Sequence, residues 1–260
     1  MEREAAMVAL IVPAVARCAE MDPAQAPARV HPEEELMIAG AGAGRRREFR
    51  AGRACAHLAL ERLGAGGGPV LRGERGEPLW PDEVRGSITH CERYAACAVA
   101  TSGEVAALGI DAEPNEALRE GLLSRIALPA ERGRVEAALS GGLGVRFDRL
   151  LFCGKEAAFK AWFACAHRVL GLGDVEISFG AAERAAVRGS GQGGRAEPGG
   201  GPAAGGSALV GTLRARIVAP EPFARDGAVP REMEGRWCAA GGILAASVWQ
   251  PAPGRKAARR

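Results

Sequence analysis

One acidic residue stands within an apolar helix face in the segment FCGKEAAFKAW, which begins at Phe152. At about 100° per residue, Phe152, Phe159 and Phe163 form one stripe of a helix, and Glu156 lies in that stripe. A carboxylate facing a core must be paired, protonated or bound to a metal ion, so Glu156 is a candidate for acid–base or metal chemistry. The alternative is an exposed Glu156–Lys160 pair, which stabilises a helix by on the order of a few tenths of a kcal/mol.

A second pair of acids follows an apolar segment upstream of this helix. Residues 105–110 read as a buried strand that continues into Asp111 and Glu113 and stops at Pro114, which has no N–H for a sheet. Alternate strand residues share a face roughly 7 Å apart, so Asp111 and Glu113 could surround one hard cation, most naturally Mg²⁺. Acids before proline also cap turns, so this pair alone is a weak signal.

A histidine precedes this strand. Residues 86–94, GSITHCERY, lead into the apolar run 95–100, and Ser102-Gly103 then forms a turn into residues 105–110. Two short strands around a turn that contains glycine predict a hairpin. His90 would then lie at the start of the strand beside the two acids, although a single histidine is as often a satisfied polar group as a ligand.

Helices and strands alternate along the rest of the chain. Helix signals end at Gly64, and the Gly/Ala/Pro-rich segment 188–206 is too poor in large apolar residues to build a core. The expected strands are 7–12, 70–72, two within 95–110, 176–179, 208–218, 234–238 and 242–249, and the expected helices are 32–39, 46–63, a helical region at 117–140, and 148–169.

Composition excludes several classes of protein. The 260 residues are 47% hydrophobic and 25% charged, and the net charge of +3 is too small to indicate nucleic-acid binding. Seven cysteines without a C-x-x-C pair fit a reducing compartment better than a disulfide framework. No apolar run reaches the roughly 18 residues of a membrane span, and Glu2 and Glu4 argue against a signal peptide.

Five segments, in order, resemble the motifs of the 4′-phosphopantetheinyl transferases, specifically the long, two-lobed enterobactin- and surfactin-synthetase type. The resemblance covers roughly residues 33–180. The segments read RRREFRAGR (45–53), GEPLWP (76–81), SITH (87–90), GIDAE (109–113) and FCGKEAAFK (152–160). Each is weak alone, whereas the ordered set is highly specific. One departure is Glu77, where surfactin-type members carry lysine, which puts that phosphate contact in doubt.

The resemblance implies an α+β fold of two pseudo-symmetric α/β lobes with the active site in the cleft between them. We expect an N-terminal lobe at 1–108, a C-terminal lobe at 109–250 with a flexible loop near 188–206, and a disordered basic tail at 251–260. The implied reaction moves the 4′-phosphopantetheine arm of coenzyme A to a serine of an apo acyl or peptidyl carrier protein. It depends on Mg²⁺ and yields the holo carrier protein and 3′,5′-ADP.

The resemblance also implies roles for the candidate residues. Asp111, Glu113 and Glu156 would hold Mg²⁺, and Glu156 would be the catalytic base that accepts the serine proton, directly or through a water. Lys160, the second catalytic residue, would stabilise the departing phosphate. The implied coenzyme A contacts are Arg45, Arg53, Arg72, Thr89, His90, Asp111, Lys155 and Lys160.

Several arginines are candidates for phosphate contacts. Arg45 and Arg53 are eight residues apart, so on one helix they share a face within about 80°, and the resemblance directs them at the 3′-phosphate. A solvated basic face is the alternative, because three more arginines lie between them. Either Arg72 or Arg75 could supply a further phosphate contact; the register is ambiguous, and Arg72 is favoured.

Two other functions stay open on the sequence. Another metal-dependent phosphoryl enzyme acting on a nucleotide could use the same acids, and a non-catalytic module could bind coenzyme A through its basic residues. The transferase interpretation predicts a cytoplasmic monomer whose partners are coenzyme A and, transiently, an acidic carrier protein, with no nucleic acid and no membrane. Carriers of siderophore peptide synthetases, such as the enterobactin synthase complex, of polyketide synthases and of fatty acid synthases are all compatible.

Overall fold

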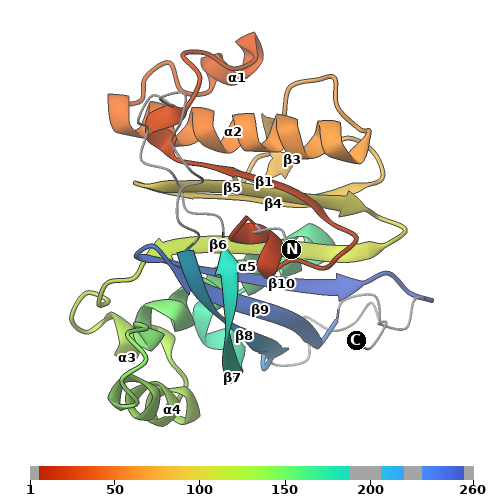
Figure 1. Cartoon of the computed structure of the whole chain (residues 1–260). Coiled ribbons are helices and arrows are strands. Elements are labelled where there is room, and N and C mark those ends of the chain that lie inside the picture. The colour runs from red at the N-terminus through yellow and green to blue at the C-terminus, as the bar shows by residue number, and fades with distance from the viewer. Residues whose placement is uncertain (1–5, 188–205, 220–229, 255–260) are drawn as a thin grey trace.

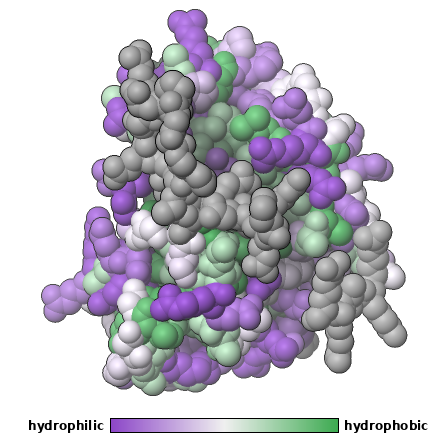
Figure 2. Space-filling model, in the orientation of Figure 1, coloured by the Kyte–Doolittle hydropathy of each residue, from purple (hydrophilic) through white to green (hydrophobic). Residues whose placement is uncertain are grey.

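The computed structural model describes residues 6–187, 206–219 and 230–254 and has the expected α+β fold. Figure 1 shows its layers: helix α2 covers a three-stranded sheet, which lies over a five-stranded sheet, and helix α5 packs on the far side of that second sheet. On the surface shown in Figure 2, hydrophilic side chains are interspersed with smaller apolar patches. The large apolar side chains are mostly inside the layers.

The N-terminal part is an antiparallel sheet of order β1-β5-β4 covered by one long helix. The buried face of α2 carries small residues, Ala51, Cys55 and Ala59 among them, so the helix lies close to the sheet. It ends at Gly64, whose φ of 80° is the left-handed conformation that glycine adopts readily. The elements are η1 (Val8–Leu10), β1 (Arg17–Met21), η2 (Pro23–Gln25), α1 (Pro32–Leu36), α2 (Ala43–Leu63), β2 (Leu71–Arg72), β3 (Pro78–Leu79), β4 (Val84–Cys91) and β5 (Tyr94–Thr101).

The C-terminal part is an antiparallel sheet of order β6-β10-β9-β8-β7 with α5 on one face. Leu150, Trp162 and Trp237 belong to the large core between them. The elements are β6 (Val105–Pro114), α3 (Leu122–Ile126), α4 (Pro129–Ser140), α5 (Phe147–Ala166), η3 (Leu172–Asp174), β7 (Val175–Val187), β8 (Gly206–Ile217), β9 (Glu232–Ala240) and β10 (Ile243–Pro251).

Strand β5 is buried on both faces, which explains its uninterrupted run of small apolar residues. Ala95, Cys97 and Val99 belong to the core under α2, whereas the alternate residues, such as Ala96 and Ala98, belong to the core shared with the five-stranded sheet. This division follows from the two-residue period of a strand. β5 therefore holds the two sheets together face to face.

The edge strands β4 and β6 meet where the two sheets adjoin. The Ser87 hydroxyl accepts a hydrogen bond from the Ile110 N–H at 3.0 Å, and the Thr89 hydroxyl accepts one from the Ala112 N–H at 2.9 Å. Edge strands expose unpaired backbone groups, and these hydroxyls satisfy two of them without a regular ladder. We call this contact the β4–β6 junction.

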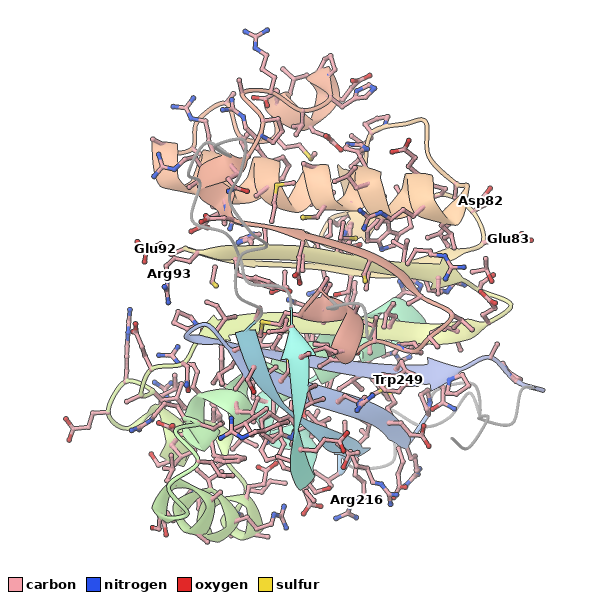
Figure 3. The ribbon with its side chains drawn as sticks, viewed as in Figure 1. Asp82, Glu83, Glu92, Arg93, Arg216 and Trp249 are labelled. Carbon is pink, nitrogen blue, oxygen red and sulfur yellow. The ribbon has the colours of Figure 1, made fainter. Side chains whose placement is uncertain are left out.

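The hairpin predicted within residues 95–110 is wrong. β5 and β6 are consecutive but belong to different sheets; the hairpin is β4–β5, in which Cys91 pairs with Tyr94. Figure 3 labels both ends of β4, with Glu83 before it and Glu92 in the turn after it. β4 nevertheless contacts β6 across the junction, and there Thr89, the residue before His90, binds Asp111.

The strand predicted at residues 7–12 is also wrong. The first strand is β1, further along the chain, which was not predicted and lies at the edge of the three-stranded sheet. Residues 8–10 form the short helix η1 because the Glu20 carboxylate accepts hydrogen bonds from the N–H groups of Met7 and Val8, both at 2.9 Å. The apolar side chains of η1 pack into the core between the sheets. A local apolar run could not reveal this contact with Glu20.

Several boundaries differ from those predicted. The helical region at 117–140 is two helices with a break before Pro129, and the loop predicted near 188–206 lies almost wholly outside the described residues. Much of the predicted tail does too, although β10 extends to Pro251. The lobe boundary predicted at 108/109 falls within strand β6, and the division into two lobes stays a prediction.

Gly109 allows α5 to lie directly on β6. A Cβ at this position would be 2.0 Å from the Ala157 carbonyl oxygen and 2.6 Å from the Ala161 nitrogen, both backbone atoms that cannot rotate away. The absence of a side chain therefore sets the distance between Asp111 on the strand and Lys160 on the helix, which meet at 2.7 Å. A glycine that allows close backbone approach has a packing reason.

We expect Gly109→Ala to destabilise the protein by roughly 1–3 kcal/mol or more and to reduce activity, because α5 must move away from β6. Chemical denaturation would measure the free energy of unfolding. Gly133→Ala is the matched control: Gly133 lies in α4 with no atom within 4 Å of an added Cβ, so this change should be neutral or stabilising by up to about 1 kcal/mol. Equal stability of the two variants would contradict the packing role of Gly109.

Candidate active site

A cavity of about 650 Å³ lies between elements of the N-terminal part and helix α5. Its walls are the inner face of α2, strand β4, the β2–β3 region and the second half of α5. The predicted coenzyme A residues that line it are Arg45, Arg53, Arg72, His90 and Lys160, and Arg75 lines it as well. The structure thus brings together residues from four separate sequence motifs. Most of these side chains are cationic, so the cavity suits an anion.

Two arginines lie over one aromatic ring in the cavity wall. The guanidinium carbon of Arg53 is 4.6 Å from the centroid of the Phe49 ring, and that of Arg72 is 5.5 Å from it. Such contacts hold a guanidinium by cation–π attraction. The Arg53 side chain is only 7% exposed, and burial lowers its pKa to about 10, so it remains charged at neutral pH. Of the two candidates, Arg72 stacks on Phe49, whereas Arg75 lines the cavity without a ring contact in the described residues.

His90 lies between a cation and an acid. Its Nε2 is 2.9 Å from Arg45 Nη1, and its Nδ1 is 3.4 Å from Glu48 Oε2. Burial, followed by the nearby charges of Arg45 and Lys160, lowers the pKa of His90 to about 4. The imidazole is therefore neutral at pH 7 and can accept a hydrogen bond from Arg45. An anion bound beside it would raise this pKa.

Lys160 joins the cavity to the acids. Its ammonium is 2.7 Å from Asp111 Oδ1 and donates to the Ile110 carbonyl oxygen at 3.0 Å. The same residue lines the cavity. The exposed Glu156–Lys160 pair considered from the sequence is not observed, because Lys160 pairs with Asp111.

The three predicted acids influence one another electrostatically. Burial raises the pKa of Glu156 and of Glu113, and the negative charge of Asp111 raises both further. Arg149 opposes this effect at Glu113, since its Nη1 is 3.1 Å from Glu113 Oε2. Glu156 is half-buried and has no hydrogen bond or ion pair within the described part of the chain. The acids therefore carry more negative charge than their protein neighbours neutralise.

The acids fit a hard divalent cation in chemistry but are not preassembled around one. Within the described residues, no three His, Cys, Asp or Glu side chains converge as a ready-made metal centre. However, Asp111 Oδ2 is buried without a hydrogen-bond partner in those residues. A divalent cation bound by these carboxylates would satisfy this oxygen and lower the raised pKa values of the other two acids. Water and phosphate oxygens would be its further ligands.

Lys155 does not reach the cavity, which contradicts its predicted phosphate contact. Its side chain is fully buried, with Nζ 2.8 Å from Glu131 Oε2 and hydrogen bonds to the carbonyl oxygens of Leu172 and Val175 at 2.8 and 2.6 Å. Burial lowers the pKa of Lys155, and Glu131 opposes that effect. On a helix, consecutive residues point about 100° apart, so Lys155 and Glu156 face different surroundings.

Thr89 also has a different place from the one predicted. Its hydroxyl donates to Asp111 Oδ1 at 3.2 Å and accepts from Ala112 N–H at 2.9 Å, and its side chain is buried in the β4–β6 junction. It does not line the cavity. Thr89 therefore orients Asp111, and the predicted direct coenzyme A contact is not supported.

Sequence reasoning missed three residues of the site. Phe49 lies one turn before Arg53 on α2, and that i,i+4 spacing could have revealed a shared face. Arg149 lies near the start of α5, two turns before Glu156, and could have been considered a counter-charge by its spacing. Glu34, buried behind Arg53, had no such signal, because it contacts residues far along the chain.

The chain matches two family models. The 4′-phosphopantetheinyl transferase N-terminal domain matches residues 33–100, and the 4′-phosphopantetheinyl transferase superfamily matches residues 107–199. These ranges contain all the segments on which the resemblance rests.

Curated relatives carry related names. The 4′-phosphopantetheinyl transferase Npt of Nocardia iowensis is 36% identical over 243 residues, which cover 93% of this chain and 99% of Npt. PptT of Mycobacterium tuberculosis (strain ATCC 25618 / H37Rv) is 46% identical over 148 residues, 57% of this chain and 64% of PptT. Enterobactin synthase component D of Escherichia coli (strain K12) is 38% identical over 125 residues, 46% of this chain and 56% of that protein.

The geometry and the comparisons agree. Residues of separate motifs surround one cationic cavity, and Lys160 in its wall binds Asp111. The similarity to Npt extends over nearly the whole of both chains. This chain therefore belongs to the 4′-phosphopantetheinyl transferase superfamily and is an enzyme of that kind.

Proposed function

We propose that the enzyme transfers the 4′-phosphopantetheine arm of coenzyme A to a serine of an apo carrier protein and releases 3′,5′-ADP. The observation that carries the proposal is the position of Lys160, which lines the cationic cavity and also binds Asp111 at 2.7 Å. Coenzyme A carries its charge in a 3′-phosphate and a pyrophosphate. The arginines of the cavity suit the former, and Lys160 beside the acids suits the latter.

The reaction is a displacement at phosphorus. The serine oxygen forms a bond to the phosphorus that carries pantetheine, the bond from that phosphorus to the bridging pyrophosphate oxygen breaks, and 3′,5′-ADP leaves. Glu156 receives the serine proton, since its carboxylate has no partner in the described residues and its raised pKa suits a proton acceptor. Lys160 stabilises the charge that develops on the leaving phosphate. The protein contributes mainly positioning and charge, as in other phosphoryl transfers.

Asp111, Glu113 and Glu156 are the residues that would hold Mg²⁺. When bound, the cation neutralises charge on the pyrophosphate oxygens. Thr89 and Lys160 orient Asp111, and Arg149 holds Glu113 by an ion pair. These contacts hold Asp111 and Glu113, whereas Glu156 has no partner in the described residues and would complete the site on binding.

The proposed acceptor is an acidic acyl or peptidyl carrier protein that binds transiently. Arg45 and Arg47 are exposed near the start of α2, where Arg45 lines the cavity, so positive charge near the entrance would attract such a partner. No helix in the described residues combines the length and apolar character of a membrane span. We further propose that the enzyme acts as a cytoplasmic monomer.

Mass spectrometry of a carrier protein tests this function. The enzyme is incubated with coenzyme A, Mg²⁺ and an apo carrier, and a gain equal to one phosphopantetheine arm, accompanied by 3′,5′-ADP, is expected. The control carrier has its acceptor serine replaced by alanine and should gain nothing. Phosphate release without a mass gain would indicate a nucleotide hydrolase, and coenzyme A binding without turnover would indicate a non-catalytic module.

Glu156→Gln should lower single-turnover transfer by on the order of 10² to 10⁴ while coenzyme A still binds through the cationic cavity. The substitution keeps size and hydrogen-bonding capacity but removes the charge and the basicity. Stopped-reaction assays and isothermal titration on one preparation measure both quantities. Glu136→Gln on the exposed face of α4 is the matched control and should leave both unchanged. A wild-type rate in the Glu156 variant would exclude the catalytic role.

The pKa of His90 should rise when 3′,5′-ADP or coenzyme A binds. In the free enzyme its pKa is about 4, and a phosphate beside it opposes the effect of Arg45, so the pKa should rise by at least about one unit. Binding is then coupled to proton uptake and strengthens as the pH falls through about 5 towards 4, the range between the raised pKa and the pKa of the free enzyme. NMR titration of the four histidines measures the shift, and His90→Asn identifies the resonance. An unchanged pKa would place the phosphate elsewhere.

A further inference from the structure

A carboxylate with no access to solvent lies behind the arginine wall of the cavity. Glu34, in α1, is 0% exposed. Its Oε1 accepts a hydrogen bond from the Val70 N–H at 2.8 Å and lies 2.9 Å from His57 Nε2, and its Oε2 accepts from the His31 N–H at 3.2 Å. Burial opposes ionisation, but the hydrogen bonds from His57 and Val70 outweigh it and lower the pKa of Glu34. Glu34 is therefore a buried anion at neutral pH.

The cation nearest this anion in the cavity wall is Arg53. Arg53 Nε is 4.0 Å from Glu34 Oε1 and has no hydrogen-bond partner in the described residues. Glu34 is the only acid within ion-pair distance of Arg53 in that part of the chain. Its charge attracts the base of the guanidinium group from behind, while the same group lies over Phe49 and lines the cavity. The direction of the Arg53 side chain thus depends on Glu34.

The second arginine of the wall is connected to the same carboxylate. Val70 donates its N–H to Glu34 and immediately precedes β2. Arg72 is the second residue of that strand. β2 is only two residues long, and among the residues that the structure describes it pairs with β3 alone, so its own ladder constrains it weakly. The bond to Glu34 fixes where β2 begins and therefore where Arg72 approaches Phe49. One carboxylate connects α1, α2 and β2.

We propose that Glu34 is a positioning residue that sets the cavity's selectivity for a phosphate monoester by aligning Arg53 and Arg72. The inference rests on the proposed function, in which that monoester is the 3′-phosphate of coenzyme A. Glu34 contacts no substrate atom itself. A fixed pair of guanidinium groups binds a phosphate dianion better than two mobile ones, because less side-chain entropy is lost on binding.

Comparing coenzyme A with dephospho-coenzyme A tests this role in Glu34→Gln. The affinity for coenzyme A should fall about tenfold or more, the affinity for dephospho-coenzyme A should change less than about twofold, and kcat at saturating coenzyme A should stay within about twofold. Isothermal titration and steady-state kinetics give the three values. A merely structural residue would lower both affinities or neither.

Glu35→Gln is the matched control. Glu35 is the next residue of α1 and loses the same charge, but it binds Arg50 at 2.7 and 2.8 Å, and Arg50 does not line the cavity. Its substitution should leave the preference for coenzyme A unchanged. An equal loss of preference in both variants would overturn the proposal, because it would reflect net charge alone.

Two further measurements keep the outcome decisive. If Glu34→Gln does not fold, as judged by thermal denaturation, Glu34→Asp keeps the charge and should show a smaller loss of the same selectivity; unchanged selectivity in that variant would overturn the proposal. In the double variant Glu34→Gln/Arg53→Gln, the loss should equal that of Arg53→Gln alone if Glu34 acts mainly through Arg53. If the wild-type enzyme binds coenzyme A and the Glu34 variant keeps the same preference for coenzyme A over dephospho-coenzyme A, only this inference is rejected. Wild-type enzyme that binds no coenzyme A rejects the proposed function.

Discussion

The site depends on the β4–β6 junction, where two sheet edges that share no ladder are held together by side chains. Lys160 contributes most directly. Its ammonium contacts the carbonyl oxygens of Ile88 on β4 and Ile110 on β6, at 3.4 and 3.0 Å, and binds Asp111 at 2.7 Å. A partly buried ammonium requires such compensation for its lost hydration. Lys160 therefore lines the cavity and also joins the edges of the two sheets, so its substitution would affect both the structure and the site.

Two neighbouring charged residues on α5 differ in how completely their polar atoms are satisfied. Lys155 is completely buried, yet Glu131 and two carbonyl oxygens satisfy it. Glu156, the next residue, is only half-buried and has no partner in the described residues. A satisfied buried charge stabilises one arrangement of α4, α5 and β7, whereas an unsatisfied one is available to a ligand or a proton. The degree of satisfaction, more than the degree of burial, identifies the functional group here.

Local sequence patterns predict the helices and strands that carry the site. They fail where contacts between residues distant in the sequence determine the position of a side chain. Helix α2 and its stop at Gly64 follow from periodicity and glycine chemistry, and the D-x-E strand end was recognised from alternation and a proline. The sequence predicts a histidine beside the acids from a hairpin that does not exist; across the junction it is Thr89, the residue before His90, that contacts Asp111. The roles of Lys155 and Glu34 depend on Glu131, His57 and Val70, which no local spacing relates to them.

The positive and negative charges lie at different ends of the site. Arginines gather at the α2 and β2 walls and carboxylates at the end of β6, with Lys160 between the two groups. An anionic ligand without a cation would be attracted to the arginines and repelled by the acids, so its terminal phosphate would enter the arginine wall first. The low pKa of His90 supports this order, because a neutral imidazole beside Arg45 leaves the positive charge of the wall to be neutralised by the ligand. In the proposed mechanism, the unneutralised acids then remain for the reacting end of the ligand, where a cation and a proton acceptor would be needed together.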